Sequence, residues 1–259
     1  MSLNIFRLVK SIILNLRSRY IPKYKLNYRD QGLINYIDVG SVGGLPDPWR
    51  SKANVVRFLL NFEPNESPQH GRNFMTYNTA VWESDEILPF YIYKGFNATG
   101  SSLFKQNFEY VKKNYDHLKE RGPESLAKTW FDRSQLVKTA EIECRTIDNI
   151  LRDEFPATPF HFMKIDAQGA EYNILKGAQS LLKSSCIGLH LELFTLPLYR
   201  GIVLLDGVEA YLSDFGFRMV KKFPAHGTFD AQHDCLFLRE GDSTLSSVIL
   251  KVYGINKNF

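Results

Sequence analysis

The second half of the sequence alternates between short apolar runs and segments in which apolar residues recur at helical spacing. Residues 160–165 and 186–194 are mostly apolar over the length of a strand, and residues 174–182 between them carry a helical stripe. Two further apolar runs, 217–223 and 235–239, close the pattern. Strands that alternate with helices form right-handed crossovers, so this half predicts a mostly parallel sheet with helices on both faces.

The first half extends the same sheet. Apolar runs at 33–40, 54–62 and 74–82 predict three buried strands, and we expect a short added strand at 90–93. Further elements are a helix over 104–120, a loop-rich stretch over 123–140, a strand over 141–145, a helix that Thr146 caps, and a capping box of Asp206 with Glu209. The two consecutive strands at the end predict an antiparallel edge strand.

A glycine-rich turn follows the first predicted strand. Asp38 to Gly44 read DVGSVGG, and Glu63 stands 25 residues after Asp38, at the end of the second predicted strand. Glycines there let the backbone approach a nucleotide closely, and an acid at the second strand can accept both ribose hydroxyls. The turn could also bind nothing. Pro46 and Pro48 leave little room for a helix that opens on a pyrophosphate, which favours S-adenosylmethionine over a dinucleotide.

Residues 164–178 read KIDAQGAEYNILKGA. This segment resembles the signature of the FkbM-type S-adenosylmethionine-dependent methyltransferases. The resemblance extends over about residues 33–240 through an ordered set of segments: the glycine turn, FEPN at 62–65, AVWE at 80–83, TGSSL at 99–103, RTIDNIL at 145–151, and DCLFLR at 234–239. It implies a Rossmann-like class I methyltransferase fold, with a seven-stranded, mostly parallel sheet, an antiparallel edge strand, and helices on both faces.

The resemblance also implies a cofactor site for S-adenosylmethionine. Its predicted contacts are the backbone of Gly40, Ser41 and Gly43 at the amino-acid end, Asp38 beneath it, Glu63 with Pro64 at the ribose, Ala80 and Val81 beside the adenine, and Asp166 next to the methionine moiety. A helix cap is the alternative role for Asp166.

Methylation of a hydroxyl requires positioning of donor and acceptor and removal of a proton. The candidate catalytic residues at predicted strand tips are Asp166, His190 and Glu192. A divalent metal between Asp166 and Glu192 is an alternative, but we favour a metal-free base and predict no metal ligands. His190 could equally be a core histidine, and we interpret His226 and His233 as part of a solvated loop.

Three features depart from the family pattern. Gln168 stands where the family usually has Glu, and the first motif continues as LPDPW instead of a regular helix. Residues 104–140 form a helical cap insertion that we expect to shape the acceptor pocket. The acceptor is therefore the property that transfers least from the family. We expect a hydroxyl of a sugar, a polysaccharide or a related small metabolite, in line with a role in polysaccharide biosynthesis.

The charge is distributed unevenly. The chain carries 32 basic and 28 acidic residues, and residues 1–29 hold seven basic residues and no acid. The other 230 residues therefore hold 25 basic against 28 acidic residues, a net charge of −3. We interpret residues 1–30 as a basic amphipathic helix or arm and residues 31–259 as the methyltransferase domain. An acidic domain argues against a nucleic-acid partner.

Location and partners follow from the same features. No secretory signal or membrane-spanning run occurs, and Cys144, Cys186 and Cys235 lie far apart in apolar runs, which predicts buried thiols in a cytoplasmic protein. The arm predicts either packing on the domain or peripheral contact with the inner membrane. Three other functions compete with this one: a non-catalytic S-adenosylmethionine-binding or membrane-associated adapter, an NAD oxidoreductase, and an RNA methyltransferase. Against the oxidoreductase, this sequence lacks the third glycine of the G-x-G-x-x-G motif and a Tyr-x-x-x-Lys motif. The oligomeric state does not follow from the sequence.

Overall fold

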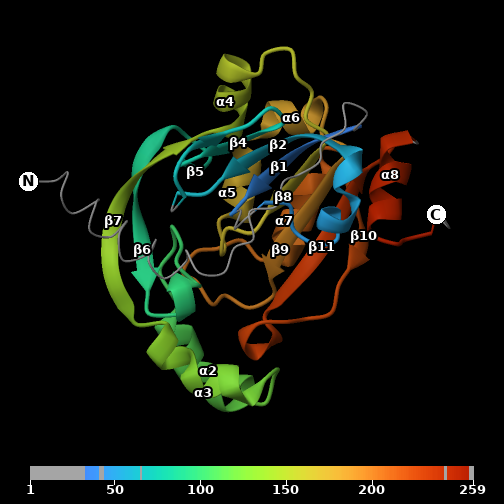
Figure 1. Cartoon of the computed structure of the whole chain (residues 1–259). Helices are drawn as coiled ribbons and strands as arrows, with labels where there is room; N and C mark the ends of the chain where they lie inside the picture. The colour runs from blue at the N-terminus through green and yellow to red at the C-terminus, as the bar shows by residue number, and fades with distance from the viewer. Residues whose placement is uncertain (1–32, 41–43, 65, 242–243, 257–259) are drawn as a thin grey trace, which may run out of the picture.

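A computed structural model describes residues 33–40, 44–64, 66–241 and 244–256 (Figure 1). The predicted arm at 1–30 and the predicted cofactor contacts Ser41 and Gly43 lie outside the described residues.

One twisted sheet runs through the centre of the molecule (Figure 1). Its order is β10-β11-β9-β8-β1-β2-β4-β3. The strands are β1 (Ile34–Val39), β2 (Val56–Phe62), β3 (Gln69–His70), β4 (Phe74–Tyr77), β8 (Phe162–Ile165), β9 (Gly188–Phe194), β10 (Phe217–Lys222) and β11 (Gln232–Arg239). The pairs β1–β2, β1–β8, β2–β4 and β8–β9 are parallel. The predicted Rossmann-like, mostly parallel sheet is therefore confirmed.

The sheet differs from the prediction at both edges. It has eight strands instead of seven, because the two-residue strand β3 pairs antiparallel with β4 at one edge. At the other edge, β11 is antiparallel to both β9 and β10 and lies between them. The antiparallel strand β11 is therefore second from the edge, and β10 forms the edge itself. This order arises because the chain passes from β9 through α7 (Leu205–Ser213) to β10 and then turns back into β11.

Two apolar layers cover the sheet. On one face, α4 (Ile147–Glu154), α5 (Glu171–Lys176), α6 (Gln179–Lys183) and α7 pack against alternate strand residues such as Ile37 and Leu191. On the other face, the 3₁₀ segment η1 (Trp49–Val55) and the C-terminal α8 (Thr244–Val252) pack against Tyr36 and Phe162. Because strand side chains alternate between faces, β1 is buried along its whole length.

Local signals at the helix ends were partly right. Thr146 caps α4, and its side chain accepts a hydrogen bond from the backbone N–H of Asn149 at 3.1 Å, as predicted. The capping box of Asp206 with Glu209 is wrong, because α7 begins after Leu204, which leaves Asp206 inside the first turn, and no side chain caps its N-terminus. The sequence patterns also did not predict α8.

A second, three-stranded sheet stands beside the first and has the order β5-β7-β6. Its strands are β5 (Ala80–Val81), β6 (Glu86–Tyr93) and β7 (Leu136–Arg145). The single strand predicted over 74–82 is therefore wrong, because the chain leaves the central sheet after β4 and joins the second sheet at β5. The strands expected at 90–93 and 141–145 are parts of the longer antiparallel pair β6–β7.

The segment between β6 and β7 is helical. It contains the 3₁₀ turn η2 (Phe96–Ala98), α2 (Phe108–Leu118) and α3 (Glu124–Arg133). The helix expected over 104–120 is present as α2, whereas the stretch expected to be loop-rich contains α3. Both helices pack against the hairpin that connects β10 and β11 and includes η3 (Thr228–Asp230), in a third apolar cluster around Trp130 and Phe229.

Two further sequence expectations concern membranes and thiols. Cys144, Cys186 and Cys235 are free and buried, as predicted. Among the described residues, no helix has the length and apolar character needed to cross a membrane.

Candidate functional site

A cavity of about 280 Å³ opens where β1, β2 and β8 end. The carboxyl ends of parallel strands meet at one edge of the sheet, which is where doubly wound sheets bind ligands. The cavity is lined by Val39, Gly40, Phe62, Glu63, Pro64, Thr79, Ala80, Val81, Phe90, Ala98, Thr99, Gly100, Ser101, Leu103, Asp166, Ala167, Gln168, Ala170 and Ile174. Six predicted site residues are therefore brought together: Gly40, Glu63, Pro64, Ala80, Val81 and Asp166.

Gly40 allows two strand tips to meet at the cavity floor. Its φ is +77°, and a Cβ built there would lie 2.0 Å from the carbonyl oxygen of Asp166. The Gly40 N–H donates to the carbonyl of Phe62 at 3.0 Å, and the Asp166 N–H donates to that of Val39 at 3.1 Å. Any side chain at position 40 would therefore separate the ends of β1 and β8.

Glu63 and Asp38 take different positions at this edge. Glu63 follows β2, is 7% exposed and lines the cavity. Asp38 is buried one residue before the end of β1, and its Oδ1 lies 3.9 Å from Nζ of Lys164. Asp38 is not among the residues that line the cavity, and its predicted position beneath the ligand stays a prediction.

Strand β6, η2 and the residues that follow η2 supply a wall that the site predictions did not include. Phe90, residues 98–101 and Leu103 line this side of the cavity. The sequence signals for this wall were the TGSSL segment and residues 89–91, which are parts of the family resemblance. Ser102 connects this wall to the turn that follows β8, because its Oγ donates a hydrogen bond to the carbonyl of Gln168 at 2.8 Å.

The turn after β8 is held by Glu171 and Gln168. A buried oxygen of Glu171 accepts from the backbone N–H groups of Ala167 at 2.9 Å and Gly169 at 3.2 Å. Burial raises the pKa of Glu171 to about 7, against the opposing effect of these hydrogen bonds. Gln168 adopts a positive φ of +53°, and its Nε2 donates to Asp166 at 3.2 Å and to Glu192 at 2.8 Å.

Lys164 pairs with two acids inside this edge. Its Nζ lies 3.3 Å from Asp166 Oδ2 in addition to its contact with Asp38. Burial by itself would lower the pKa of Lys164, but the carboxylates of Asp166 and Asp38 outweigh it and raise the pKa above its usual value.

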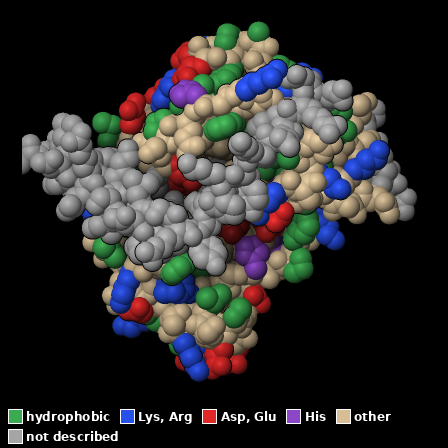
Figure 2. Space-filling view, viewed as in Figure 1, with side chains coloured by type: hydrophobic (Ala, Val, Ile, Leu, Met, Phe, Trp, Pro, Cys, Tyr) green, Lys and Arg blue, Asp and Glu red, His purple; other side chains and the backbone are tan. Residues whose placement is uncertain are grey.

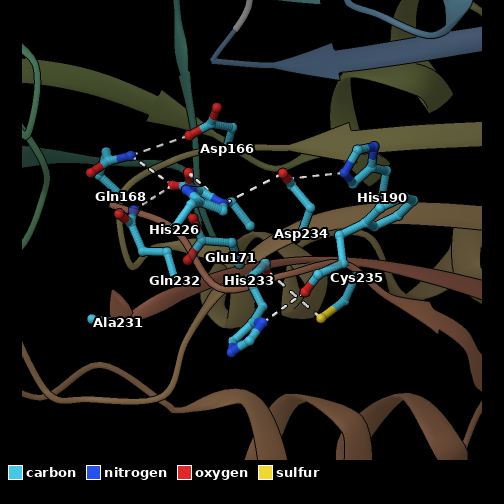
Figure 3. Close-up of polar contacts among 12 residues, drawn as sticks. Asp166, Gln168, Glu171, His190, His226, Ala231, Gln232, His233, Asp234 and Cys235 are labelled. Carbon is cyan, nitrogen blue, oxygen red and sulfur yellow. Dashed lines mark hydrogen bonds and ion pairs between the residues drawn. The ribbon is translucent and has the colours of Figure 1, made fainter. Parts of the chain in front are cut away.

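Glu192 lies next to Asp166 at the end of β9. Its Oε2 accepts hydrogen bonds from Gln168 and from Gln232, each at 2.8 Å. Burial, and then the nearby carboxylate of Asp166, raise the pKa of Glu192 well above its usual value. Figure 3 shows Asp166 joined to Gln168 at this edge of the sheet.

His190 belongs to a different set of contacts on the same sheet face. Nδ1 lies 2.7 Å from the hydroxyl of Tyr253, and Nε2 lies 3.0 Å from Asp234 Oδ1. Although burial opposes it, the hydrogen bond to His190 lowers the pKa of Asp234. Both ring nitrogens of His190 are thus engaged within the protein. His190 lies beside Asp234 (Figure 3), and it is not among the residues that line the cavity.

His226 joins this cluster from the connection between β10 and β11. Its Nε2 lies 3.4 Å from Asp234 Oδ2 and 3.9 Å from Glu192 Oε1. The sequence analysis interpreted His226 as part of a solvated loop, because nothing local relates it to strands 34 residues earlier in the chain. Among the described residues, no group of three or more His, Cys, Asp or Glu side chains has an arrangement that could hold a metal ion.

Comparison with known proteins identifies the family. A model of the FkbM methyltransferase domain matches residues 49–219. The chain belongs to the FkbM methyltransferase family. The match covers most of the central sheet, the second sheet and the α2–α3 insertion, so the family assignment made from the ordered motifs is confirmed.

Solved structures add two similar proteins. A methyltransferase FkbM from Methylobacillus flagellatus KT matches with a TM-score of 0.42 at 14% identity, over 79% of this chain and 43% of that one. Sp1610 of Streptococcus pneumoniae, whose proposed activity is that of a tRNA (m1A22) methyltransferase, matches with a TM-score of 0.36 at 16% identity, over 87% of this chain and 72% of that one. This FkbM chain thus spans less than half the length of the first structure. No curated protein matches it significantly.

Proposed function

We propose that this FkbM protein transfers a methyl group from S-adenosylmethionine to a hydroxyl of a sugar or related polyol. The observation that carries the proposal is the cavity at the ends of β1, β2 and β8. It combines a glycine floor that has no room for a side chain with a buried acid at the tip of β2. Those two features suit a nucleoside with a ribose, as the family membership implies.

The chain's own residues fit this cofactor. Gly40 borders the cavity with backbone alone, and the carboxyl group of Glu63 can accept hydrogen bonds from ribose hydroxyls. Ala80 and Val81 contribute a small apolar wall opposite, suited to an adenine ring. When bound, S-adenosylmethionine would supply an electrophilic methyl group.

The acceptor site would lie beyond Asp166, over β8 and β9. Asp166, Glu192 and Asp234 present carboxyl oxygens there, and Gln168 and Gln232 bridge to Glu192. A surface rich in hydrogen-bond acceptors suits a ligand with several hydroxyl donors. The same acids would repel a polyanion, and in Figure 2 the described Lys and Arg side chains are scattered among acids instead of forming one patch. These features favour a neutral acceptor over a nucleic acid.

The test measures cofactor binding and methyl transfer separately. Calorimetry with S-adenosylhomocysteine should detect binding, and Glu63→Gln should weaken it at least tenfold, because a Gln side chain has one acceptor oxygen instead of two. Glu143→Gln removes an equally charged but exposed side chain on β7 and should leave the affinity unchanged.

Transfer is measured with S-adenosylmethionine labelled in its methyl group and a panel of neutral methyl pyranosides and the corresponding nucleotide sugars. Label should appear in at least one sugar as an ether that resists alkali. No binding of S-adenosylmethionine or S-adenosylhomocysteine at millimolar concentration would contradict the proposal. Binding without transfer to any panel member would contradict the sugar acceptor.

A further inference from the structure

His226 lies in a polar cluster with Glu192 and Asp234, and the chemistry proposed above gives it no role. Its Nε2 is buried and makes no hydrogen bond to any described residue, although two carboxyl groups lie within 4 Å of it. The side chain as a whole is 39% exposed, so part of the ring is accessible from outside the protein. Figure 3 shows it between the Asp166–Gln168 pair and Asp234.

The other candidate bases are occupied. Both nitrogens of His190 are hydrogen-bonded, one to Tyr253 and one to Asp234. Asp166 is ion-paired with Lys164, and Glu192 accepts two amide hydrogen bonds. Of the two imidazoles in contact with Asp234, His226 is thus the one whose ring can accept a proton without losing a hydrogen bond to the described part of the chain.

The loop that carries His226 is held on two sides. Its backbone forms an isolated bridge with Gln232, with N–H to carbonyl distances of 2.9 and 3.3 Å. Three residues on, Phe229 is fully buried against Trp130 and adopts a positive φ of +62°. Arg133 of α3 also donates to Thr228 Oγ1 at 2.9 Å. A non-glycine residue in this strained region persists only where its surroundings hold it, so the insertion fixes the loop.

We propose that His226 is the general base that removes the acceptor's hydroxyl proton, with Asp234 and Glu192 as positioning residues. The inference rests on the proposed function. Since Nε2 is turned toward the two carboxyl groups, Nδ1 is the nitrogen that meets the acceptor. A proton on Nε2 then faces Oδ2 of Asp234 at 3.4 Å, and that carboxylate stabilises the imidazolium that forms.

The proton and electron balance is complete with this residue. The acceptor oxygen forms a bond to the methyl carbon while the carbon–sulfur bond breaks, and that electron pair stays on sulfur. The hydroxyl proton passes to Nδ1 of His226 and from there to water. No metal, oxidant or reductant is required.

The first experiment measures transfer with the neutral methyl pyranoside panel. His226→Ala should lower the rate about 100-fold or more, the usual contribution of a general base. Added imidazole should restore part of the rate with saturation, because the truncated side chain leaves space for it. S-adenosylhomocysteine affinity, measured by calorimetry, should change less than twofold, which shows that the variant is folded.

His233→Ala is the matched control. His233 lies in the same hairpin, but its neighbours Gln232 and Asp234 point to the site, so its ring lies on the opposite face of β11, where Nδ1 is 2.8 Å from the carbonyl of Phe223. This variant should retain the parent rate and show no response to imidazole.

A second readout does not depend on turnover. In protein labelled with ¹⁵N-histidine and saturated with S-adenosylhomocysteine, adding the panel sugars should shift the ring signals of His226, assigned by their loss in His226→Ala. The signals of His233 should stay in place.

A His226→Ala variant that keeps more than a third of the rate, or one that imidazole does not rescue, would overturn the inference while the proposed function stands. So would sugar binding that leaves the His226 signals unchanged. If the parent enzyme neither labels nor binds any panel member, the sugar acceptor of the proposed function fails, and the role of His226 fails with it.

Discussion

At the scale of single residues, the site depends on backbone positions as much as on side chains. Gly40 and Gly201 have similar positive φ values, +77° and +80°, but different surroundings. A Cβ at Gly40 would lie 2.0 Å from a carbonyl oxygen, whereas one at Gly201 meets no described atom within 4 Å. Comparing the same substitution at the two glycines therefore separates the cost of the left-handed backbone from the cost of steric overlap.

Gly40→Ala should destabilise the protein more than Gly201→Ala. The left-handed conformation costs about 1–2 kcal/mol for alanine at either position. Overlap at Gly40 adds about 1–3 kcal/mol, because two strand tips must move apart. Urea unfolding measures the difference, and calorimetry should show weaker S-adenosylhomocysteine binding for Gly40→Ala alone. Equal losses of stability would mean that the β1–β8 contact adapts easily.

Glu171 should make stability depend on pH. Its pKa is about 7 in the folded protein and near 4.5 in the unfolded chain. The folded state therefore binds this proton more tightly, so its contribution is fully present below pH 4.5 and is lost as the pH rises to 7 and above. The difference corresponds to about 3 kcal/mol.

Glu171→Gln should remove that dependence, because an amide oxygen can still accept the two backbone hydrogen bonds but does not ionise. Urea unfolding of the parent and the variant at pH 5 and pH 8 measures it, with Glu143→Gln as the exposed control. Glu192, whose pKa is also raised, makes the unfolding free energy fall with pH in both proteins. Only the difference between the two pH profiles therefore reports on Glu171. Parallel pH profiles for the parent and Glu171→Gln would contradict the prediction.

At the scale of secondary-structure elements, the α2–α3 insertion supports the hairpin between β10 and β11. Trp130 is 3% exposed and contacts the rings of Phe108, Phe131 and Phe229. The sequence predicted α2 from its apolar spacing but not α3, whose buried residues are only Ala127 and Trp130. An element that buries so few side chains has a weak periodic signal, and its partner is a loop 100 residues away.

Trp130→Ala should cost about 3–5 kcal/mol of unfolding free energy, as expected when a large buried aromatic side chain is truncated. The matched change is Phe96→Ala in η2, where the ring is 81% exposed and truncation should cost less than about 0.5 kcal/mol. Urea unfolding compares the two. A loss below 1 kcal/mol for Trp130→Ala would show that the insertion is not tightly packed on the hairpin.

At the scale of the whole molecule, charge is divided between the arm and the domain. Residues 1–29 hold seven basic residues, whereas the rest of the chain has a net charge of −3. We propose that the arm attaches the enzyme to anionic membranes, since each basic residue near such a surface contributes about 1 kcal/mol. An acceptor carried on a lipid would then lie close to the site.

Deletion of residues 1–29 should abolish sedimentation with phosphatidylglycerol vesicles and leave S-adenosylhomocysteine affinity unchanged. Neither protein should bind phosphatidylcholine vesicles, and salt should weaken the binding of the full chain. Ile12→Asp retains all seven basic residues but interrupts the apolar spacing, so it should bind more weakly than the parent. A deletion variant that binds phosphatidylglycerol vesicles as well as the parent would contradict the proposal.

The sequence by itself determined the order and type of most strands and helices, because apolar periodicity is local and each strand tip carries its own motif. Gly40, Glu63 and Asp166 could be predicted for the same reason: each follows a recognisable buried strand. The tertiary structure alone decided which residues meet across strands. Lys164, Glu192, Asp234 and His226 are separated by up to 70 positions, and only the pairing of β8, β9 and β11 brings them together. Such pairings depend on long-range packing, for which a single chain's local pattern carries no signal.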